Sequence, residues 1–295
     1  MSAHPVWEQD GRDWPNRGAS RFVAAAGLRW HVQIMGSGPV ILLAHGTGAA
    51  THSWRALAPL LGARFTVVAP DLPGHGFSEM PPPQRMSLPG MAQALGGLLR
   101  TLGLTPALVA GHSAGAAVLA RMVLDGVIAP HALVGLNAAL LPLGGAHADI
   151  FAPLARAVAG LSIVPRIFAW RAADPAVVLR LMQGTGSAID AEGLRLYGRL
   201  ARRPGHIAAA FAMMANWDLR SLARDLPRLK LPLVLVVGSN DRTIAPADAV
   251  RVRALVPGAG IVTLPGLGHL AHEERPDLVA DLLIRHAATA ELCPA

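Results

Sequence analysis

Hydrophobic positions along the chain follow two periods that alternate through most of its length. Short apolar runs typical of buried strands occupy residues 40–44, 65–69, 107–111, 132–136, 233–237 and 260–264. Segments of helical spacing lie between them, at 53–61, 87–102, the stretch after Ser113, 246–256 and from Pro276 onward. Two further strands are expected at 20–26 and 28–35, around a turn at Gly27. Strands that alternate with helices predict an α/β fold whose mostly parallel, eight-stranded sheet is covered on both faces.

The alternation stops near Leu141 and resumes near residue 227. The segment between is mainly helical in pattern and is interrupted by prolines. We therefore expect residues 1–140 and 227–295 to form one core and residues 141–226 to form a helical cap inserted over it.

The most informative local pattern is Gly111-His-Ser-Ala-Gly115, which follows an apolar run and precedes a helical pattern. It has the form of a nucleophile elbow, in which a sharp strand-to-helix turn raises the serine hydroxyl above the end of the sheet. Side chains two residues on either side of that serine would collide, which explains the two glycines. Ser113 is the predicted catalytic nucleophile.

A serine hydroxyl needs a base to take its proton, and the base needs an orienting acid. In this architecture the three follow in the order serine, acid, histidine. Asp241 follows the strand at 233–237, and His269 lies in a glycine-flanked loop after the last strand. These two residues are the predicted catalytic acid and base.

Other residues compete for these roles. Asn137 stands where some enzymes of this architecture carry the acid, but it cannot hold the charge, and Asp149 lies too far along. Asp218 is expected to cap a helix or form a salt bridge. His272 falls inside an expected helix start, and His112 is expected to pack under the sheet or bond the backbone.

A tetrahedral intermediate needs hydrogen-bond donors for its oxyanion. The backbone N–H of Ala114 is one candidate, and that of Thr47, in the loop His45-Gly-Thr-Gly48, is the second. This loop resembles a dinucleotide fingerprint but lacks its last glycine and the acidic residue that should follow. No cofactor is therefore expected, and no metal site is expected either, because no histidine–carboxylate cluster has the spacing of a metal site. The loop Asp71-Leu-Pro-Gly-His-Gly-Phe-Ser78 is expected to shape the site floor through turns.

Within the expected cap, one set of side chains has two possible roles. They form part of the hydrophobic core, or they line the wall of a substrate site. Pliable methionines suit a large apolar ligand, but such stripes are also common in cores. Met213, Met214 and Trp217 are the predicted substrate-binding residues. The rest of the set is Met182, Tyr197 and Phe211.

Composition narrows the class of protein. The net charge is +7, almost all of it from arginine, since Lys230 is the single lysine. The arginines are scattered without a compact basic run, so GC-rich coding explains the excess and nucleic-acid binding is not expected. The first residues have no secretory pattern, no apolar run spans a bilayer, and Cys293 is the only cysteine. We expect a cytoplasmic protein without disulfides.

The motifs His45-Gly-Thr-Gly, Asp71-Leu-Pro-Gly-His-Gly, Gly111-His-Ser-Ala-Gly and Gly268-His269 resemble the α/β-hydrolase superfamily over residues 20–290. Further segments resemble the family of magnesium chelatase accessory proteins of bacteriochlorophyll biosynthesis. They are Asp10-Gly-Arg-Asp-Trp-Pro-Asn16, the run from His45 to Trp54, Met213-Met-Ala-Asn-Trp-Asp-Leu219 and Gly268-His-Leu-Ala-His-Glu-Glu-Arg-Pro276.

That resemblance implies a role in photosynthetic pigment synthesis near magnesium insertion into protoporphyrin IX, with chelatase subunits as partners and a porphyrin as ligand. Three hypotheses stay open. The first is a serine hydrolase acting on an ester-type bond. The second is a non-catalytic porphyrin-binding or chelatase-assembly protein. The third is a generic carboxylesterase, carbon–carbon bond hydrolase or cofactor-free peroxidase on a small apolar substrate, since such enzymes share catalytic residue types.

Overall fold

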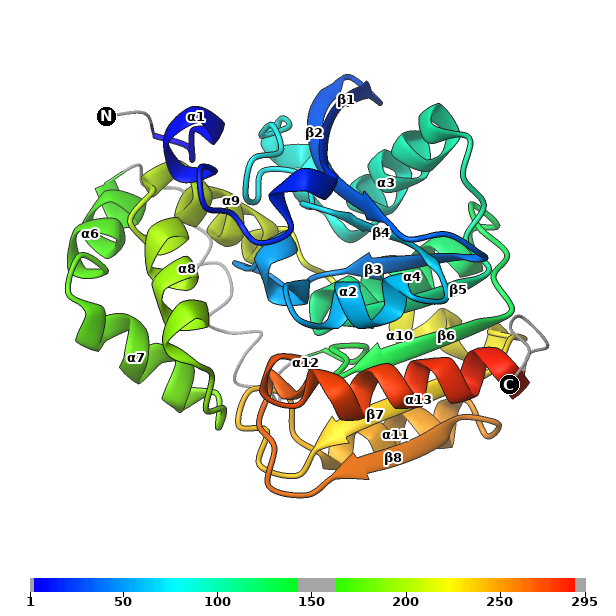
Figure 1. Cartoon of the computed structure of the whole chain (residues 1–295). Coiled ribbons are helices and arrows are strands. Elements are labelled where there is room, and N and C mark those ends of the chain that lie inside the picture. The colour runs from blue at the N-terminus through cyan, green and yellow to red at the C-terminus, as the bar shows by residue number, and fades with distance from the viewer. Residues whose placement is uncertain (1–2, 143–162, 290–295) are drawn as a thin grey trace.

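The central sheet has eight strands in the order β1-β2-β4-β3-β5-β6-β7-β8 (Figure 1). The computed structural model describes residues 3–142 and 163–289. The strands are β1 (Ser20–Ala25), β2 (Leu28–Met35), β3 (Val40–Ala44), β4 (Thr66–Pro70), β5 (Leu108–His112), β6 (Ala132–Leu136), β7 (Leu233–Gly238) and β8 (Gly260–Leu264). β2 pairs antiparallel with β1 and β4, and every other pairing is parallel. The expected α/β fold class is confirmed.

Helices alternate with the parallel strands as expected. The α-helices are α1 (Trp7–Asp10), α2 (Leu57–Gly62), α3 (Leu88–Leu102), α4 (Ala114–Leu124), α6 (Ile163–Arg171), α7 (Pro175–Gly184), α8 (Ala191–Ala201), α9 (Pro204–Ala215), α10 (Arg220–Asp225), α11 (Ala247–Leu255), α12 (Ala271–Glu274) and α13 (Pro276–Thr289). Short 3₁₀ helices are η1 (Arg17–Ala19), η2 (Thr51–Trp54), η3 (Pro83–Met86) and η4 (Leu226–Arg228).

The single helix expected at 53–61 is wrong, because the segment is divided into η2 and α2. Tertiary contacts fix the tighter first turn. The Ser53 hydroxyl is bonded to Glu273, and the Trp54 ring is fully buried in the core beneath the sheet. The hydrophobic periodicity of the sequence does not reveal such long-range contacts.

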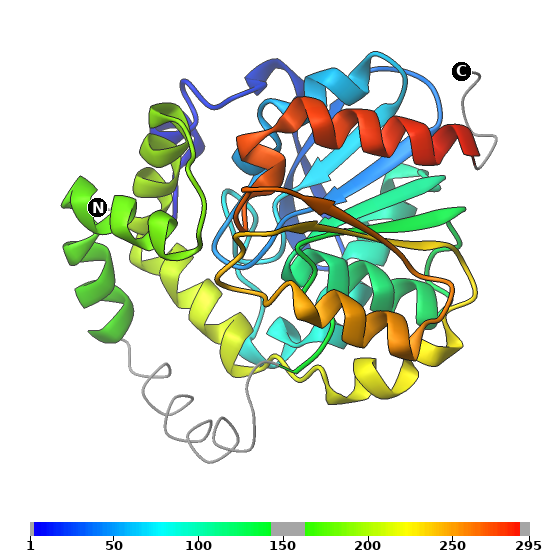
Figure 2. The ribbon, with the colours of Figure 1, turned by 90° about the horizontal axis from the view of Figure 1, so that it is seen from below.

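Successive residues of each central strand enter two different cores, one on each face of the sheet. In β7, Leu235 joins the core formed with α3, α4, α10 and α11, whereas Val234 and Val236 join the core formed with α2 and α13. Figure 2 shows the sheet between these two helical layers. Burial on both faces explains why the strands read as continuous apolar runs.

Between β6 and β7 the chain leaves the sheet. Helices α6–α9, called the inserted helices below, lie beyond the carboxyl ends of the strands (Figure 1). α10 returns to the sheet face, where Asp225 forms an ion pair with Arg121 of α4 at 2.8 Å. Asp149 and Cys293 lie outside the described residues, and the division into core and cap at residues 141 and 226 stays a prediction.

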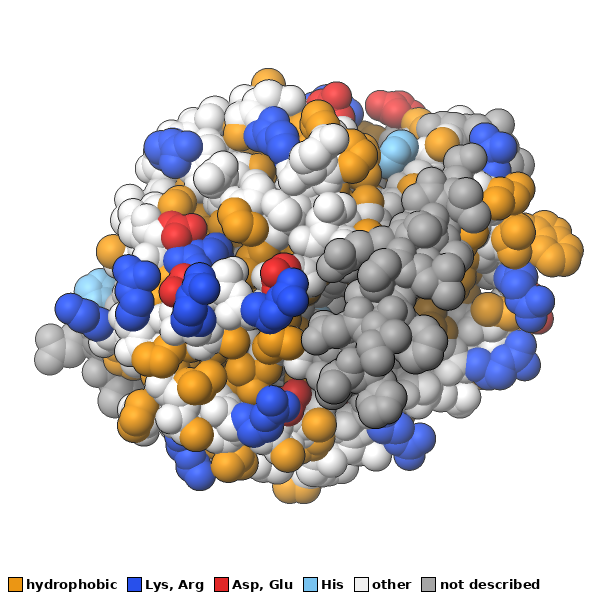
Figure 3. Space-filling model, turned by 180° about the vertical axis from the view of Figure 1, so that it is seen from behind, with side chains coloured by type: hydrophobic (Ala, Val, Ile, Leu, Met, Phe, Trp, Pro, Cys, Tyr) orange, Lys and Arg blue, Asp and Glu red, His pale blue; other side chains and the backbone are white. Residues whose placement is uncertain are grey.

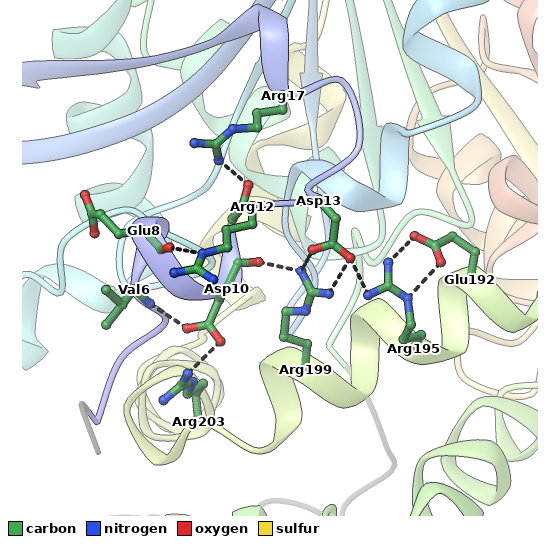
Figure 4. Close-up of polar contacts among 11 residues, drawn as sticks. Val6, Glu8, Asp10, Arg12, Asp13, Arg17, Glu192, Arg195, Arg199 and Arg203 are labelled. Atoms are coloured by element: carbon green, nitrogen blue, oxygen red, sulfur yellow. Dashed lines mark hydrogen bonds and ion pairs between the residues drawn. The ribbon is translucent and has the colours of Figure 1, made fainter.

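The N-terminal arm crosses from the sheet to the inserted helices. Asp13 forms ion pairs with Arg195 and Arg199 of α8, and Asp10 forms one with Arg203 (Figure 4). Trp14 is buried beside them and donates its indole N–H to Thr51 Oγ1 at 2.9 Å. The arm thereby fixes α8 against the core. Within the described residues, no helix has the length and apolarity needed to cross a membrane.

Candidate active site

Ser113 occupies a strained turn between β5 and α4. Its φ of 50° and ψ of −118° lie outside the ordinary regions for a residue with a side chain. A Cβ at Gly115 would lie 2.1 Å from the Ala44 carbonyl oxygen, and one at Gly111 would lie 2.4 Å from the Ala116 nitrogen. Only glycine fits at either position, as the sequence predicts for a nucleophile elbow.

Asp241 and His269 lie together at the ends of β7 and β8. His269 Nδ1 is 2.8 Å from Asp241 Oδ2, and both residues are buried. The other carboxylate oxygen, Oδ1, accepts the backbone N–H groups of Thr243 and Ile244 at 2.7 and 3.0 Å. Burial raises the pKa of Asp241, but the His269 hydrogen bond and these two backbone donors outweigh burial and leave the pKa below its usual value. The acid is held ionised beside the imidazole.

Asn137 supports the same carboxylate from the neighbouring strand β6. Its side-chain amide donates to Asp241 Oδ2 at 2.7 Å, and its backbone has a φ of 46°. The residue that stands at the alternative acid position therefore donates to the acid instead of replacing it.

His112 links the elbow to the histidine loop. Its Nε2–H donates to the His269 carbonyl oxygen at 2.9 Å, and the two rings lie 4.7 Å apart. Burial, together with the neighbouring His272 and His269, lowers the pKa of His112 well below its usual value, so the ring is neutral. The expected backbone bond of His112 is confirmed, and it brings His269 next to the residue that precedes Ser113. No hydrogen bond joins Ser113 Oγ to His269 within the described residues.

The loop after β3 lies against the elbow. A Cβ at Gly46 would lie 3.1 Å from the Ser113 Cβ, so Thr47 follows immediately beside the nucleophile. The Thr47 hydroxyl donates to Met213 Sδ at 3.4 Å. Met213 is fully buried, Trp217 is half-buried, and Met214 is 55% exposed. Of the three predicted substrate-binding residues, the structure brings Met213 to the loop after β3, which contains Thr47.

His206 of α9 is a contact that sequence reasoning missed. Its Nδ1 accepts the Gly76 N–H at 3.1 Å, which leaves Nε2–H to donate to the Gly48 carbonyl at 3.0 Å. Burial, then neighbouring His75, lowers the pKa of His206 to about 3. A neutral ring therefore joins an inserted helix to two loops at the site. The Met and aromatic pattern around it gave no sign of this role.

The turn between α7 and α8 also contacts the two loops that carry Asp241 and His269. The His269 N–H donates to the Thr185 carbonyl at 3.3 Å, and the Arg242 N–H donates to the same oxygen at 3.1 Å. Leu270 N–H donates to Ser187 Oγ at 2.8 Å, and a Cβ at Gly268 would lie 2.3 Å from Gly186. The sequence Gly184-Thr-Gly-Ser187 signals a turn, but nothing in it indicates the loops that it contacts.

A second buried polar cluster, centred on Glu273, lies beside the Asp241–His269 pair. Glu273 accepts the Tyr197 hydroxyl at 2.7 Å and the Ser53 hydroxyl at 2.8 Å, and it pairs with Arg55. His272 Nε2–H donates to Ser53 Oγ at 2.7 Å. Burial, then His269 and Arg55, lowers the pKa of His272 to about 3. His272 thus serves this cluster, while His269 contacts Asp241.

The remaining candidates have structural contacts. Asp71 is fully buried and accepts the Thr51 N–H, the Phe77 N–H and the His31 ring. Asp218 pairs with Arg220 and accepts its backbone N–H. Among the residues that the structure describes, no three His, Cys, Asp or Glu side chains are grouped to hold a metal ion.

A nucleophile elbow, an aspartate–histidine pair at later strand ends and an eight-stranded sheet define the class. The sequence profile of the alpha/beta hydrolase family matches residues 41–282, and the chain belongs to this family. A solved alpha/beta hydrolase fold protein from Burkholderia ambifaria is 25% identical, with a TM-score of 0.75 over 90% of this chain and 97% of that one.

Within the family, the chain is similar to two characterised relatives over most of its length. It is 38% identical to the magnesium-chelatase 30 kDa subunit of Rhodobacter capsulatus, over 92% of this chain and 95% of the relative. It is 28% identical to the 2-(acetamidomethylene)succinate hydrolase of Mesorhizobium japonicum, over 88% of this chain and 91% of the relative.

Proposed function

We propose that the chain is a serine hydrolase. It would act on an ester-type bond at a metabolic step close to the insertion of magnesium into protoporphyrin IX. The observation that carries the catalytic part is the 2.8 Å contact between Asp241 and His269, held beside the Ser113 elbow by the His112 bond. The similarity to the magnesium-chelatase 30 kDa subunit supports the metabolic setting.

The geometry supports a two-step acyl transfer. Ser113 Oγ attacks the acyl carbon as its proton moves to His269 Nε2, and the carbonyl electrons form an oxyanion near the N–H groups of Thr47 and Ala114. The bond to the leaving oxygen then breaks as His269 returns the proton to it. A water molecule then attacks the acyl group on Ser113 in the same way, and the carboxylic acid product is released. Ionised Asp241 stabilises the imidazolium in both steps.

A fluorophosphonate probe tests the nucleophile. We expect the wild type and the exposed-serine control Ser37→Ala to be labelled and Ser113→Ala to stay unlabelled. Ser113→Ala should also lose about 10³-fold or more in the rate of ester hydrolysis. Labelling or turnover that persists in Ser113→Ala would contradict the assignment.

A second function is supported by the same similarity. The chain would bind a porphyrin, or support assembly of magnesium chelatase, without needing Ser113, Asp241 and His269 for catalysis. The 38% identity over 92% of the chain to a protein named as a chelatase subunit favours this alternative.

Complementation separates the two functions. A strain lacking the gene is restored with wild type or with Ser113→Ala, and pigment is measured. Pigment from wild type alone supports catalysis, whereas equal pigment from both supports the accessory role. Titration of the protein with protoporphyrin IX, followed by quenching of its tryptophan fluorescence, then tests binding directly.

A further inference from the structure

Exposed apolar side chains concentrate on the part of the chain between β6 and β7. Eight large hydrophobic residues are exposed within the described ranges, and six of them lie there. They are Ile163, Ile167, Trp170, Leu179, Leu181 and Met214, and the exposed fraction of Trp170 reaches 75%. An indole that protrudes this far has no packing role in the folded chain, so the concentration needs a separate explanation.

Three of these residues form a continuous stripe on α6. Ile163, Ile167 and Trp170 are four and three residues apart, which places them on one face of a helix. The opposite face is the packed one, because Pro165 and Ala169 are buried there. This set, called the α6 stripe below, is therefore additional to the face that holds the helix on the protein.

Arginines flank the α6 stripe. At roughly 100° per residue, Arg166 falls on one side of it and Arg171 on the other. The next helix, α7, repeats the combination with exposed Leu179, Leu181 and Arg180. Between residues 163 and 184 the only acidic side chain is Asp174, which caps α7 by accepting the Ala176 N–H. Figure 3 shows hydrophobic side chains protruding at this edge of the molecule, with cationic ones beside them.

We propose that the α6 stripe and its flanking arginines dock the protein onto the surface of an anionic lipid bilayer. An apolar stripe with an exposed tryptophan fits the boundary between headgroups and acyl chains, and flanking arginines reach anionic headgroups while their stems cover apolar surface. The exposed Arg166, Arg171 and Arg180 make this surface complementary to a negatively charged one. This proposal stands independently of the proposed catalytic function.

Co-sedimentation with vesicles tests the docking. The test variant is Trp170→Ser/Arg166→Glu. The control is Val250→Ser/Arg253→Glu on α11, which also replaces one exposed hydrophobic side chain by serine and reverses the charge of one exposed arginine. Vesicles contain phosphatidylcholine alone or with about one-third phosphatidylglycerol, an anionic lipid.

We expect the wild type and the control to bind the anionic vesicles and the test variant to bind them at least about tenfold more weakly. Raised salt should weaken wild-type binding. Failure of the wild type to bind, equal binding to neutral vesicles, or equal loss in both variants would overturn the proposal. So would light scattering that detects a dimer broken only by the test variant, which would assign the α6 stripe to a second copy.

Discussion

At the scale of single residues, the backbone conformation and close packing around the site determine which residue types fit there. Ser113 and Asn137 follow neighbouring strands, and both have a positive φ. Their side chains lie at the carboxyl end of the sheet. Asn137 is the more unexpected of the two. It donates to Asp241 from the strand end where a charged acid would compete, so it holds the Asp241 carboxylate in place.

Replacing Asn137 by glycine tests this positioning. Asn137→Gly keeps the left-handed backbone and removes the amide donor. Because a hydrogen bond to a charged group is worth about 1.5–3 kcal/mol, we expect kcat for an ester substrate to fall about tenfold or more with KM little changed. Asn137→Asp, which sets a second carboxylate against Asp241, should be more damaging. An unchanged kcat in Asn137→Gly would show that Asp241 needs no such support.

Tyr197 gives a spectroscopic test of the second polar cluster, because it is the only tyrosine in the chain. Burial, then the Glu273 carboxylate, raises the pKa of its phenol well above the usual value. A raised pKa in the folded state means that stability is lost as pH rises above about 10, where the unfolded phenol ionises. We expect ultraviolet absorbance to show no phenolate until the protein unfolds. A midpoint near 10 in the folded protein would refute the hydrogen bond to Glu273.

At the scale of elements, the inserted helices are tied to the core by many separate contacts. His206 contacts the loop after β3 at Gly48, the turn at 185–187 contacts the loops that follow β7 and β8, and the N-terminal arm contacts α8. The arm uses two kinds of contact: exposed ion pairs of Asp13 and a buried indole at Trp14. Their expected strengths differ, because solvent screens exposed pairs whereas burial of a large ring does not depend on charge.

Two substitutions in the arm should separate these contacts. We expect Asp13→Asn to lower the free energy of unfolding by less than about 1 kcal/mol, as is usual for exposed ion pairs. Trp14→Ala should lower it by about 3–5 kcal/mol through the cavity it leaves. Trp170→Ala, which truncates an exposed tryptophan, is the control and should change little. Urea unfolding measures all three, and equal losses from Asp13→Asn and Trp14→Ala would contradict this ranking.

At the scale of the whole molecule, histidine is the most frequent of the buried polar residue types in the part of the chain that the structure describes. Burial is the largest cause that lowers the pKa of His45 to about 4 and those of His75, His206 and His272 to about 3. All four are neutral in the folded protein near neutral pH. As pH falls through about 6.5, the unfolded chain gains protons that the folded protein does not, so folding stability decreases.

The expected result is a marked acid sensitivity. Each such histidine removes about 1.4 kcal/mol of stability per pH unit below its unfolded pKa. Urea midpoints measured between about pH 7 and about pH 5 should therefore fall steeply. His206→Gln, which keeps a donor for Gly48, should reduce the slope by about one proton. His131→Gln removes an exposed histidine and should leave the slope unchanged, whereas a flat wild-type profile would contradict the neutral buried rings.

The strand pattern, the elbow and the pairing of Asp241 with His269 could all be predicted from the amino-acid sequence. The first two depend on neighbouring residues: burial on both faces gives continuous apolar runs, and steric crowding gives the glycines at 111 and 115. The parallel sheet then brings successive strand ends to one edge. The same local reasoning failed at 53–61, where distant partners of Ser53 and Trp54 divide the helix.

The distant groups that support the site could be identified only in the folded chain. The amide of Asn137, the ring of His206 and the turn at 185–187 meet the catalytic loops across long stretches of chain, and no local period encodes such contacts. The arginines are a similar case. Along the sequence they are scattered, but helix geometry gathers Arg166 and Arg171 on either side of an apolar stripe, because a helix brings residues three and four apart onto one face.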